Sequence, residues 1–244
     1  MRYEVLGPLR VLGAAPGTAL NAYKVRVLLG VLLTRAGHVV AMDRLITDIW
    51  DGGPPRTAVG AVHVHICRLR RQLGDGAITT TPRGYRINVD EFDLTLFRDA
   101  AKRGRDHAAA GRHAQAVDDL GTALALWRGP ALDGLTDNIA LGGFSASLDD
   151  DRLACAEAYA DSGLILGRHR EMAGTLRQLV VEHPLHEPLH HRLMIALHLS
   201  GQKTEALMAY ASASAILRRE IGLEPGRELQ SLYREIRHEL VPAA

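Results

Sequence analysis

The stretch from residue 56 to residue 86 constrains the fold of this chain more than any other. On a helical wheel of 100° per residue, apolar side chains cluster within about 60° of Val62. They are Ala58, Val59, Ile66, Leu69 and Leu73. This spacing predicts an amphipathic helix over residues 56–73 whose apolar stripe packs against a core. The opposite side carries Thr57, Gly60, Val64, Cys67, Arg68 and Arg71, with His63 and Arg70 on its flanks.

A β-hairpin is predicted directly after this helix. Thr79, Thr80 and Thr81 are β-branched, Pro82 favours a turn, and Gly84 permits a positive φ. Apolar and polar residues then alternate from Tyr85 to Val89, as they do in a half-buried strand. The hairpin is therefore expected to present Arg83 at an exposed tip.

The charge of this stretch indicates the kind of partner it would meet. Residues 56–86 hold six arginines and a single acidic residue, Asp75. Residues 1–90 carry 12 Lys and Arg against 6 Asp and Glu, a net +6, whereas residues 91–244 carry 17 against 22, a net −5. Guanidinium groups bond guanine or phosphate, and a valine can contact a thymine methyl, so the pattern suits a DNA duplex. The alternative for the helix alone is an ordinary solvated basic face.

Length and composition set the broader class. A chain of 244 residues with 47% hydrophobic and 23% charged residues is typical of a two-domain globular protein. Cys67 and Cys155 lie in different predicted domains, so no disulfide is expected and a reducing cytoplasm fits. The sequence has no basic segment followed by a long apolar run and no stretch of 18 apolar residues, so we expect neither export nor a membrane span.

The first 90 residues follow the order of a winged helix-turn-helix. Short alternating runs predict strands at residues 2–6 and 9–13 and a third near 18–20. A helix is expected from residue 21 or 22 to near Gly37, and another from Met42 to Trp50. Their expected inward residues are Val25, Leu28, Leu29, Leu32 and Leu33 in the first, and Leu45, Ile46 and Ile49 in the second.

From Phe92 onward the pattern is helical and repetitive. Gly167 and Gly201 are 34 residues apart, which is the tetratricopeptide period, and Gly111 begins a third copy. Each copy is expected to be a helix, a glycine turn and a second helix. An irregular insert is predicted over residues 128–144, and a helix over residues 227–240 is expected to cap the array.

Two motifs make residues 1–90 resemble the OmpR-type DNA-binding domain, an α+β winged helix. The recognition helix of that family commonly reads V-x-V-H-I-x-x-L-R, and its wing ends in R-G-Y or R-G-x-G-Y. This chain has those residue types from Val62 to Arg70 and at Arg83, Gly84 and Tyr85. It departs from the family at Val59 and Gly60, where Arg-Asn is frequent.

The whole chain closely resembles the Streptomyces antibiotic regulatory proteins. The supporting motifs, in order, are Leu126-Trp127-Arg128-Gly129-Pro130-Ala131-Leu132, Glu182-His183-Pro184-Leu185, Gly201-Gln202-Lys203-Thr204-Glu205-Ala206-Leu207 and Leu223-Glu224-Pro225-Gly226. The resemblance implies an OmpR-type winged helix over residues 1–90 and an all-α, tetratricopeptide-like bacterial transcriptional activation domain over residues 91–244. We expect no counterpart here of the ATPase module that larger members carry, because these 244 residues contain no G-x-x-x-x-G-K-[ST] motif.

The resemblance also implies a function. Family members activate transcription of secondary-metabolite gene clusters; they bind direct repeats near promoters and engage RNA polymerase holoenzyme. We therefore expect a cytoplasmic, nucleoid-associated activator that uses no cofactor and pairs with a second copy on double-stranded DNA. The helical half would hold that second copy or the polymerase.

Particular residues follow from the resemblance and from the helical wheel. Arg68 and Arg71 are the expected base or phosphate contacts in the major groove, and Val64 is an apolar contact. Arg83 would enter the minor groove and Thr81 would contact a phosphate. Arg56, one turn before Gly60, would replace a lost phosphate contact. His65 and Arg70 complete this predicted set. Two interpretations stay open for Trp50, which are contact of its indole N–H with a phosphate and packing in the core.

Other conspicuous residues favour structural roles. His186 to His190 matches H-E-x-x-H, but Pro188 belongs in the first turn of a helix, whereas a zinc protease needs this motif in mid-helix. The run Asp149 to Asp151 is typical of a solvated helix surface. We expect Trp127 and Tyr159 to pack between helical hairpins rather than to line a ligand groove, and Cys67 to be a small neutral filler rather than a redox-sensitive thiol.

Two further classes of function serve as alternatives to a DNA-binding activator. One is a helical-repeat ligand sensor or interaction scaffold whose winged helix contacts a protein; the concentration of arginines favours DNA instead. The other is an enzyme, for which the sequence offers no nucleophile–base pair and no nucleotide-binding loop.

Overall fold

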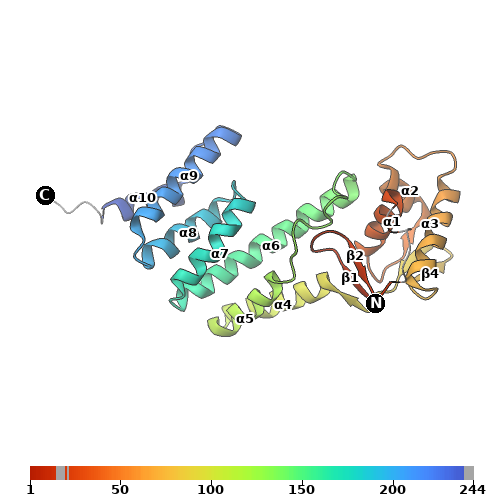
Figure 1. Cartoon of the computed structure of the whole chain (residues 1–244), viewed down its shortest axis with the longest axis horizontal. Helices are drawn as coiled ribbons and strands as arrows, with labels where there is room; N and C mark the ends of the chain where they lie inside the picture. The colour runs from red at the N-terminus through yellow and green to blue at the C-terminus, as the bar shows by residue number, and fades with distance from the viewer. Residues whose placement is uncertain (15–19, 21, 239–244) are drawn as a thin grey trace. The chain divides into compact units, whose positions relative to one another are not determined.

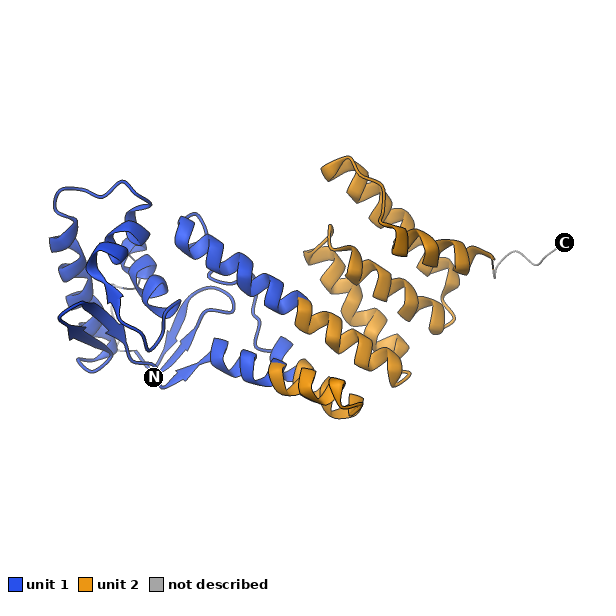
Figure 2. Ribbon diagram, turned by 180° about the vertical axis from the view of Figure 1, so that it is seen from behind, with its two compact units in different colours: residues 1–101, 122–153 blue, residues 102–121, 154–244 orange. Residues whose placement is uncertain are grey.

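The computed structural model describes residues 1–14, 20 and 22–238, and these form two compact units (Figure 2). The first unit comprises residues 1–101 and 122–153, and the second comprises residues 102–121 and 154–244. Three helices, α4 (Asp93–Ala109), α5 (His113–Leu124) and α6 (Ile139–Ile165), contribute residues to both units.

The chain opens with a small sheet whose third described strand comes from far along the sequence. Strand β1 (Arg2–Glu4) pairs antiparallel with β2 (Arg10–Leu12) and parallel with β6 (Glu91–Phe92), in the order β2-β1-β6. The two predicted strands are confirmed. The third strand predicted near residues 18–20 falls mostly outside the described residues. Strand β6 was missed because two residues carry no alternation to detect.

Three helices follow, as predicted (Figure 1): α1 (Tyr23–Leu33), α2 (Met42–Trp50) and α3 (Ala58–Leu73). The expected inward residues of α1 are all buried, and so are Val27, Gly30 and Val31. Helix α1 is covered on a further side by α6, because a Cβ at Gly30 would lie 2.9 Å from Leu141 Cδ1. In α2, Leu45 and Ile49 are buried, whereas Ile46 is half-buried and Asp48 takes an inward place. Asp48 pairs there with Arg35 at 3.1 Å and with Arg44 at 2.9 Å.

The predicted hairpin is confirmed and forms a second sheet with a short strand that the sequence did not reveal. Strands β4 (Ile78–Thr81) and β5 (Gly84–Ile87) are joined by the two-residue turn Pro82-Arg83. Strand β3 (Val40–Ala41) pairs with the other edge of β5, so the order is β3-β5-β4. We call β4, β5 and their turn the wing.

The segment between α5 and α6 is joined to the winged helix by hydrogen bonds and ion pairs. Its backbone bonds directly to the end of the first strand region, from Arg128 N to Leu6 O at 2.8 Å and from Leu132 N to Val5 O at 3.0 Å. The guanidinium of Arg128 also pairs with Asp93 at 3.2 Å and with Glu4 at 3.5 Å. This segment, whose LWRGPAL letters support the family resemblance, thus belongs to the core of the first unit.

Asp93, the first residue of α4, bonds to the same two segments. Its carboxylate accepts hydrogen bonds from Val5 N and Leu6 N at 2.9 to 3.0 Å and from Arg128. Burial nevertheless raises the pKa of Asp93, and the hydrogen bonds and Arg128 oppose that effect. The Asp93 carboxylate is therefore buried, and residues distant in the sequence supply its hydrogen-bond donors.

Trp127 packs in this unit as expected. It is buried, its ring meets Phe97 edge-on at 5.5 Å between centroids, and the Arg152 guanidinium lies 5.1 Å above it. The predicted irregular insert is confirmed for residues 128–138, but residues 139–144 belong to α6 instead. Asn138 Oδ1 accepts a hydrogen bond from Leu141 N and so caps α6, which begins earlier than the predicted insert allowed.

The second unit is built from helical hairpins with glycine turns. Its helices include α5 (His113–Leu124), α7 (His169–Glu182), α8 (Glu187–Leu199), α9 (Lys203–Ile221) and α10 (Arg227–His238). The three aligned glycines, Gly111, Gly167 and Gly201, each lie between two helices with φ between +72° and +83°. This left-handed geometry is easily adopted only by glycine, so the repeat is confirmed at the residues from which it was predicted.

The histidines of the H-E-x-x-H match have structural partners. Pro188 lies in the first turn of α8, as expected. His186 Nε2 lies 2.8 Å from Glu157 Oε1, and His190 Nε2 lies 2.9 Å from Pro184 O. Within residues 1–14, 20 and 22–238, no group of three or more His, Cys, Asp or Glu side chains is placed to hold a metal ion. None of the helices in these ranges is long and apolar enough to cross a bilayer.

Candidate nucleic-acid interface

Helix α3 buries one face and leaves the other open. Val62, Ile66 and Leu69 are at most 1% exposed, which confirms the centre of the predicted apolar stripe. The prediction was wrong at one edge, because Val59 is 49% exposed, whereas Gln72 on the opposite edge is buried. Both residues lie 60° to 80° from Val62 on the wheel, so the packing of α3 is rotated slightly toward Gln72.

The outward face of α3 is open along its length. The predicted members Thr57, Gly60, His63, Val64, Cys67, Arg68 and Arg71 are all exposed. Val64 is 50% exposed although it is apolar. Nothing lies within 4 Å of a Cβ built on Gly60, so the start of this face is open as well. A basic face with an exposed valine has the chemistry to contact a base-pair edge.

The wing presents a second basic group. Arg83 is exposed in its two-residue turn, as expected. Thr81, by contrast, donates its only hydroxyl hydrogen to Gly84 O at 3.1 Å. The Thr81 side chain therefore closes the wing turn, and it could donate to a phosphate only by giving up that bond.

Two contacts hold α3 against the wing. The Arg70 guanidinium donates to Ile78 O and to Thr80 Oγ1. His63 meets Tyr85 edge-on at 6.5 Å between ring centroids. The sequence placed Arg70 on the flank of the outward face, and the structure shows that this flank is directed toward the wing.

His65 differs from the arginines around it. It is half-buried, and burial, followed by the nearby Arg68, lowers its pKa below the ordinary value of 6.5. The imidazole is therefore neutral at pH 7. Its Nδ1 is buried without a hydrogen-bond partner among the described residues.

Trp50 and Arg56 flank the loop before α3. Arg56 is exposed, and its contact with a phosphate stays a prediction. Trp50 is half-buried, and Lys24 Nζ lies 6.0 Å from its ring centroid while donating to Ile49 O at 2.7 Å. Both interpretations of Trp50 stay open.

Sequence reasoning missed the joint at which this loop begins. Asn138 Nδ2 donates to Asp48 O at 2.7 Å and to Asp51 Oδ1 at 2.9 Å, and Ile139 N donates to Asp51 Oδ1 at 3.1 Å. Asp51 adopts the left-handed conformation at φ 50° and ends α2. We call these contacts the Asn138 joint. No local signal could reveal it, because its residues are nearly 90 positions apart.

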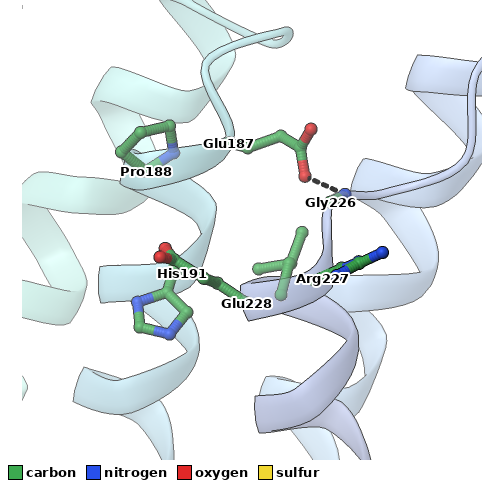
Figure 3. Close-up of a pocket in the computed structure, with 7 residues that line it drawn as sticks. Glu187, Pro188, His191, Gly226, Arg227 and Glu228 are labelled. Carbon is green, nitrogen blue, oxygen red and sulfur yellow. Dashed lines mark hydrogen bonds between the residues drawn. The ribbon is translucent and has the colours of Figure 1, made fainter.

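The second unit has a small cavity between α8 and α10 (Figure 3). It has a volume of about 260 Å³ and is lined partly by His191, Arg227 and Glu228. Glu187 Oε2 accepts a hydrogen bond from Gly226 N at 2.6 Å, as drawn in Figure 3. The cavity is smaller than the roughly 300–1,000 Å³ of most small-molecule sites. A second hollow along α10 has a volume of about 520 Å³, but polar and charged side chains line it, whereas most small-molecule sites are lined mainly by apolar ones. Neither gives much support to the ligand-sensor alternative.

Family models match most of the chain. Residues 92–237 match the bacterial transcriptional activator domain, and residues 20–87 match the C-terminal domain of transcriptional regulatory proteins. The OmpR-type winged helix followed by a helical activator domain, expected from the sequence, is thus confirmed. The boundary predicted between residues 90 and 91 stays a prediction.

Several characterised proteins resemble the chain along almost all of its length. It is 32% identical to the transcriptional regulatory protein MoaR1 of Mycobacterium tuberculosis, over 98% of this chain and 80% of MoaR1. It is 31% identical to the regulatory protein DnrI of Streptomyces peucetius, over 97% of this chain and 92% of DnrI.

A solved structure shares the fold. Mycobacterium tuberculosis EmbR in complex with a low-affinity phosphopeptide superimposes with a TM-score of 0.85 at 32% identity. The match covers 100% of this chain but 66% of EmbR, so a third of that protein has no counterpart here.

Proposed function

The chain belongs to the Streptomyces antibiotic regulatory protein family of transcription activators, and we propose that it binds specific DNA sequences through α3 and the wing. The observation that carries this proposal is the open basic face of α3, which displays Arg68, Arg71 and an exposed Val64 beside the wing arginine Arg83. Transcriptional regulators of this class act on DNA, and a face of this chemistry fits a duplex.

The proposed contacts divide by groove. Arg68 and Arg71 bond base edges or phosphates in the major groove, and Val64 contacts a thymine methyl. Arg83 enters the adjacent minor groove, whose negative potential attracts arginine. Arg56 meets a phosphate before the helix. His65 adds no charge at neutral pH, because burial lowers its pKa.

The proposed biological role is activation of a secondary-metabolite gene cluster. One winged helix contacts only a few base pairs, so two copies on direct repeats would gain affinity through effective concentration. Residues 91–244 would hold the second copy or RNA polymerase holoenzyme at the promoter, which places the protein on the nucleoid. Genomic footprinting of the bound protein would identify the repeats.

The two natural cysteines provide a direct test of DNA binding. Cys67 is exposed on the outward face of α3, whereas Cys155 is buried, which raises the pKa of its thiol to about 12. A thiol reagent at pH 7.5 should therefore label Cys67 selectively. We expect duplex DNA at about 50 mM salt to slow this labelling roughly tenfold, and we expect high salt to abolish the protection.

A matched control separates local protection from general occlusion. Ser147 is exposed on α6 in the same unit, so a Cys67→Ser/Ser147→Cys variant carries its reactive thiol away from α3. That thiol should stay reactive when DNA is bound. Unchanged labelling of Cys67 at saturating DNA would refute the proposed interface and would favour a protein-contact role for the winged helix.

A further inference from the structure

Arg70 is the arginine of α3 whose guanidinium is bonded to the wing. Its Nε donates to Ile78 O at 3.0 Å, and its Nη2 donates to Ile78 O at 2.8 Å and to Thr80 Oγ1 at 2.6 Å. Two of the three guanidinium nitrogens are therefore bonded within the protein. Arg68 and Arg71, on either side of it in sequence, are exposed on the outward face.

Arg70 donates to a backbone carbonyl group, that of Ile78, which has no hydrogen-bond partner within its sheet. Strand β4 lies at the edge of its sheet and pairs with β5 alone. Asn88 N donates to Ala77 O at 2.8 Å. Because hydrogen-bonded positions alternate along an antiparallel ladder, the carbonyl of the next residue, Ile78, faces away from β5. Arg70 satisfies this edge acceptor with two charge-assisted hydrogen bonds.

Both contacts between α3 and the wing meet one cross-strand pair. Thr80, the second acceptor of Arg70, lies opposite Tyr85 in the β4–β5 register. Tyr85 is the partner of His63 in the edge-on ring contact. Thr80 lies three residues before Arg83 and Tyr85 lies two residues after it, so contacts to this pair hold both strands next to the wing tip.

We propose that Arg70 is a positioning residue, which holds the wing so that Arg83 reaches the minor groove while Arg68 and Arg71 occupy the major groove. The inference rests on the proposed DNA-binding function, and it replaces the expectation that Arg70 touches DNA itself. A wing that is fixed in advance loses less conformational entropy when DNA binds than a wing that must first be ordered.

A double-mutant cycle on the full chain tests this role, with binding to duplex DNA measured over a range of salt concentrations. Arg83→Ala should weaken binding on the order of tenfold and lower the slope of log K against log [salt] by about one. Arg70→Ala should cause similar losses, because it displaces Arg83. Combining the two should cause no further loss.

Arg71→Ala is the matched comparison within the same helix. Arg71 is exposed on the outward face, so its loss should add in full to that of Arg83→Ala. An Arg70→Ala loss that likewise adds in full would overturn the positioning role and would restore Arg70 as a direct contact.

Arg70→Lys distinguishes charge from geometry. Lysine keeps the positive charge but lacks the planar fork that reaches Ile78 O and Thr80 Oγ1 together. The variant should therefore behave like Arg70→Ala in both affinity and salt slope. Recovery of the wild-type values by lysine would show that charge alone suffices, and this too would overturn the proposal. If Arg70→Ala fails to fold, the cycle is run with Arg70→Lys.

Different results would overturn the proposed DNA-binding function and the proposed role of Arg70. A wild-type chain that shows no salt-dependent binding to duplex DNA would remove the proposed function, and the role of Arg70 with it. A wild-type chain that binds, combined with an additive cycle, would remove the role of Arg70 alone.

Discussion

Gly84 shows how strongly one position of the wing depends on the absence of a side chain. Its φ is +150°, and a Cβ built on it would collide with Val40 O. The collision arises because β3 pairs with β5 so that Ala41 lies opposite Gly84. The R-G-Y motif therefore contains a packing requirement at glycine as well as a basic tip at Arg83.

At this residue scale we expect Gly84→Ala to lower the free energy of unfolding by about 3 kcal/mol or more, because strain and a backbone collision act together. Gly74→Ala is the matched control, since Gly74 has a φ of +87° but nothing within 4 Å of its added Cβ. Strain alone should cost the control about 1–2 kcal/mol. Denaturant unfolding measures both variants, and equal costs would contradict the collision.

At the scale of elements, the Asn138 joint connects the end of α2 to the start of α6. The side chain of Asn138 is 1% exposed and bonds Asp48 O, Asp51 and Leu141 N. Asp51 in turn accepts from the first backbone N–H of α6. The side chains of Asn138 and Asp51 thus provide hydrogen-bond partners for a carbonyl group near the end of α2 and for N–H groups at the start of α6. These bonds hold the start of the loop before α3 in a defined position.

Asn138→Ala should lower the free energy of unfolding of the first unit by about 1–3 kcal/mol, because Asp48 O loses its buried donor. Amide hydrogen exchange should rise at Leu141 N and at the end of α2. Ser147→Ala, also on α6, removes an exposed local hydrogen bond and should be nearly neutral. Unchanged exchange in Asn138→Ala would show that the joint contributes no local stability.

At the scale of the whole molecule, both compact units contain residues from the activator domain. The first unit combines the winged helix with residues 122–153, which include the segment fastened by Arg128 and Asn138. The proposed DNA-binding surface therefore belongs to a compact unit larger than the winged helix alone. Binding on tandem sites would depend on how two such bodies face each other along the duplex.

Two copies are expected to bind a direct repeat cooperatively, with a gain on the order of 100-fold over one site. Five added base pairs between the sites turn the second site by about half a helical turn, so cooperativity should vanish. About ten added base pairs should restore part of it. Titration of the protein onto the natural and altered repeats measures the cooperative gain in affinity. A gain that does not change with the spacing would contradict a fixed arrangement of two copies.

Local pattern determined much of this protein. Apolar spacing located α1, α2 and α3, β-branched residues and Gly84 located the wing, and the 34-residue period located the glycine turns at Gly167 and Gly201. The exposure of Arg68, Arg71 and Arg83 followed from the helical wheel and the turn. These features depend on neighbours within a few residues, which a sequence displays directly.

Tertiary structure alone decided the rest. Strand β6, the covering of α1 near Gly30, the Asn138 joint and the use of Arg70 by the wing all depend on which segments meet in space. The donors in these contacts are matched to acceptors that become available only after the chain has folded, such as the edge carbonyl of Ile78. A helical wheel gives the direction of Arg70 but cannot show what lies there.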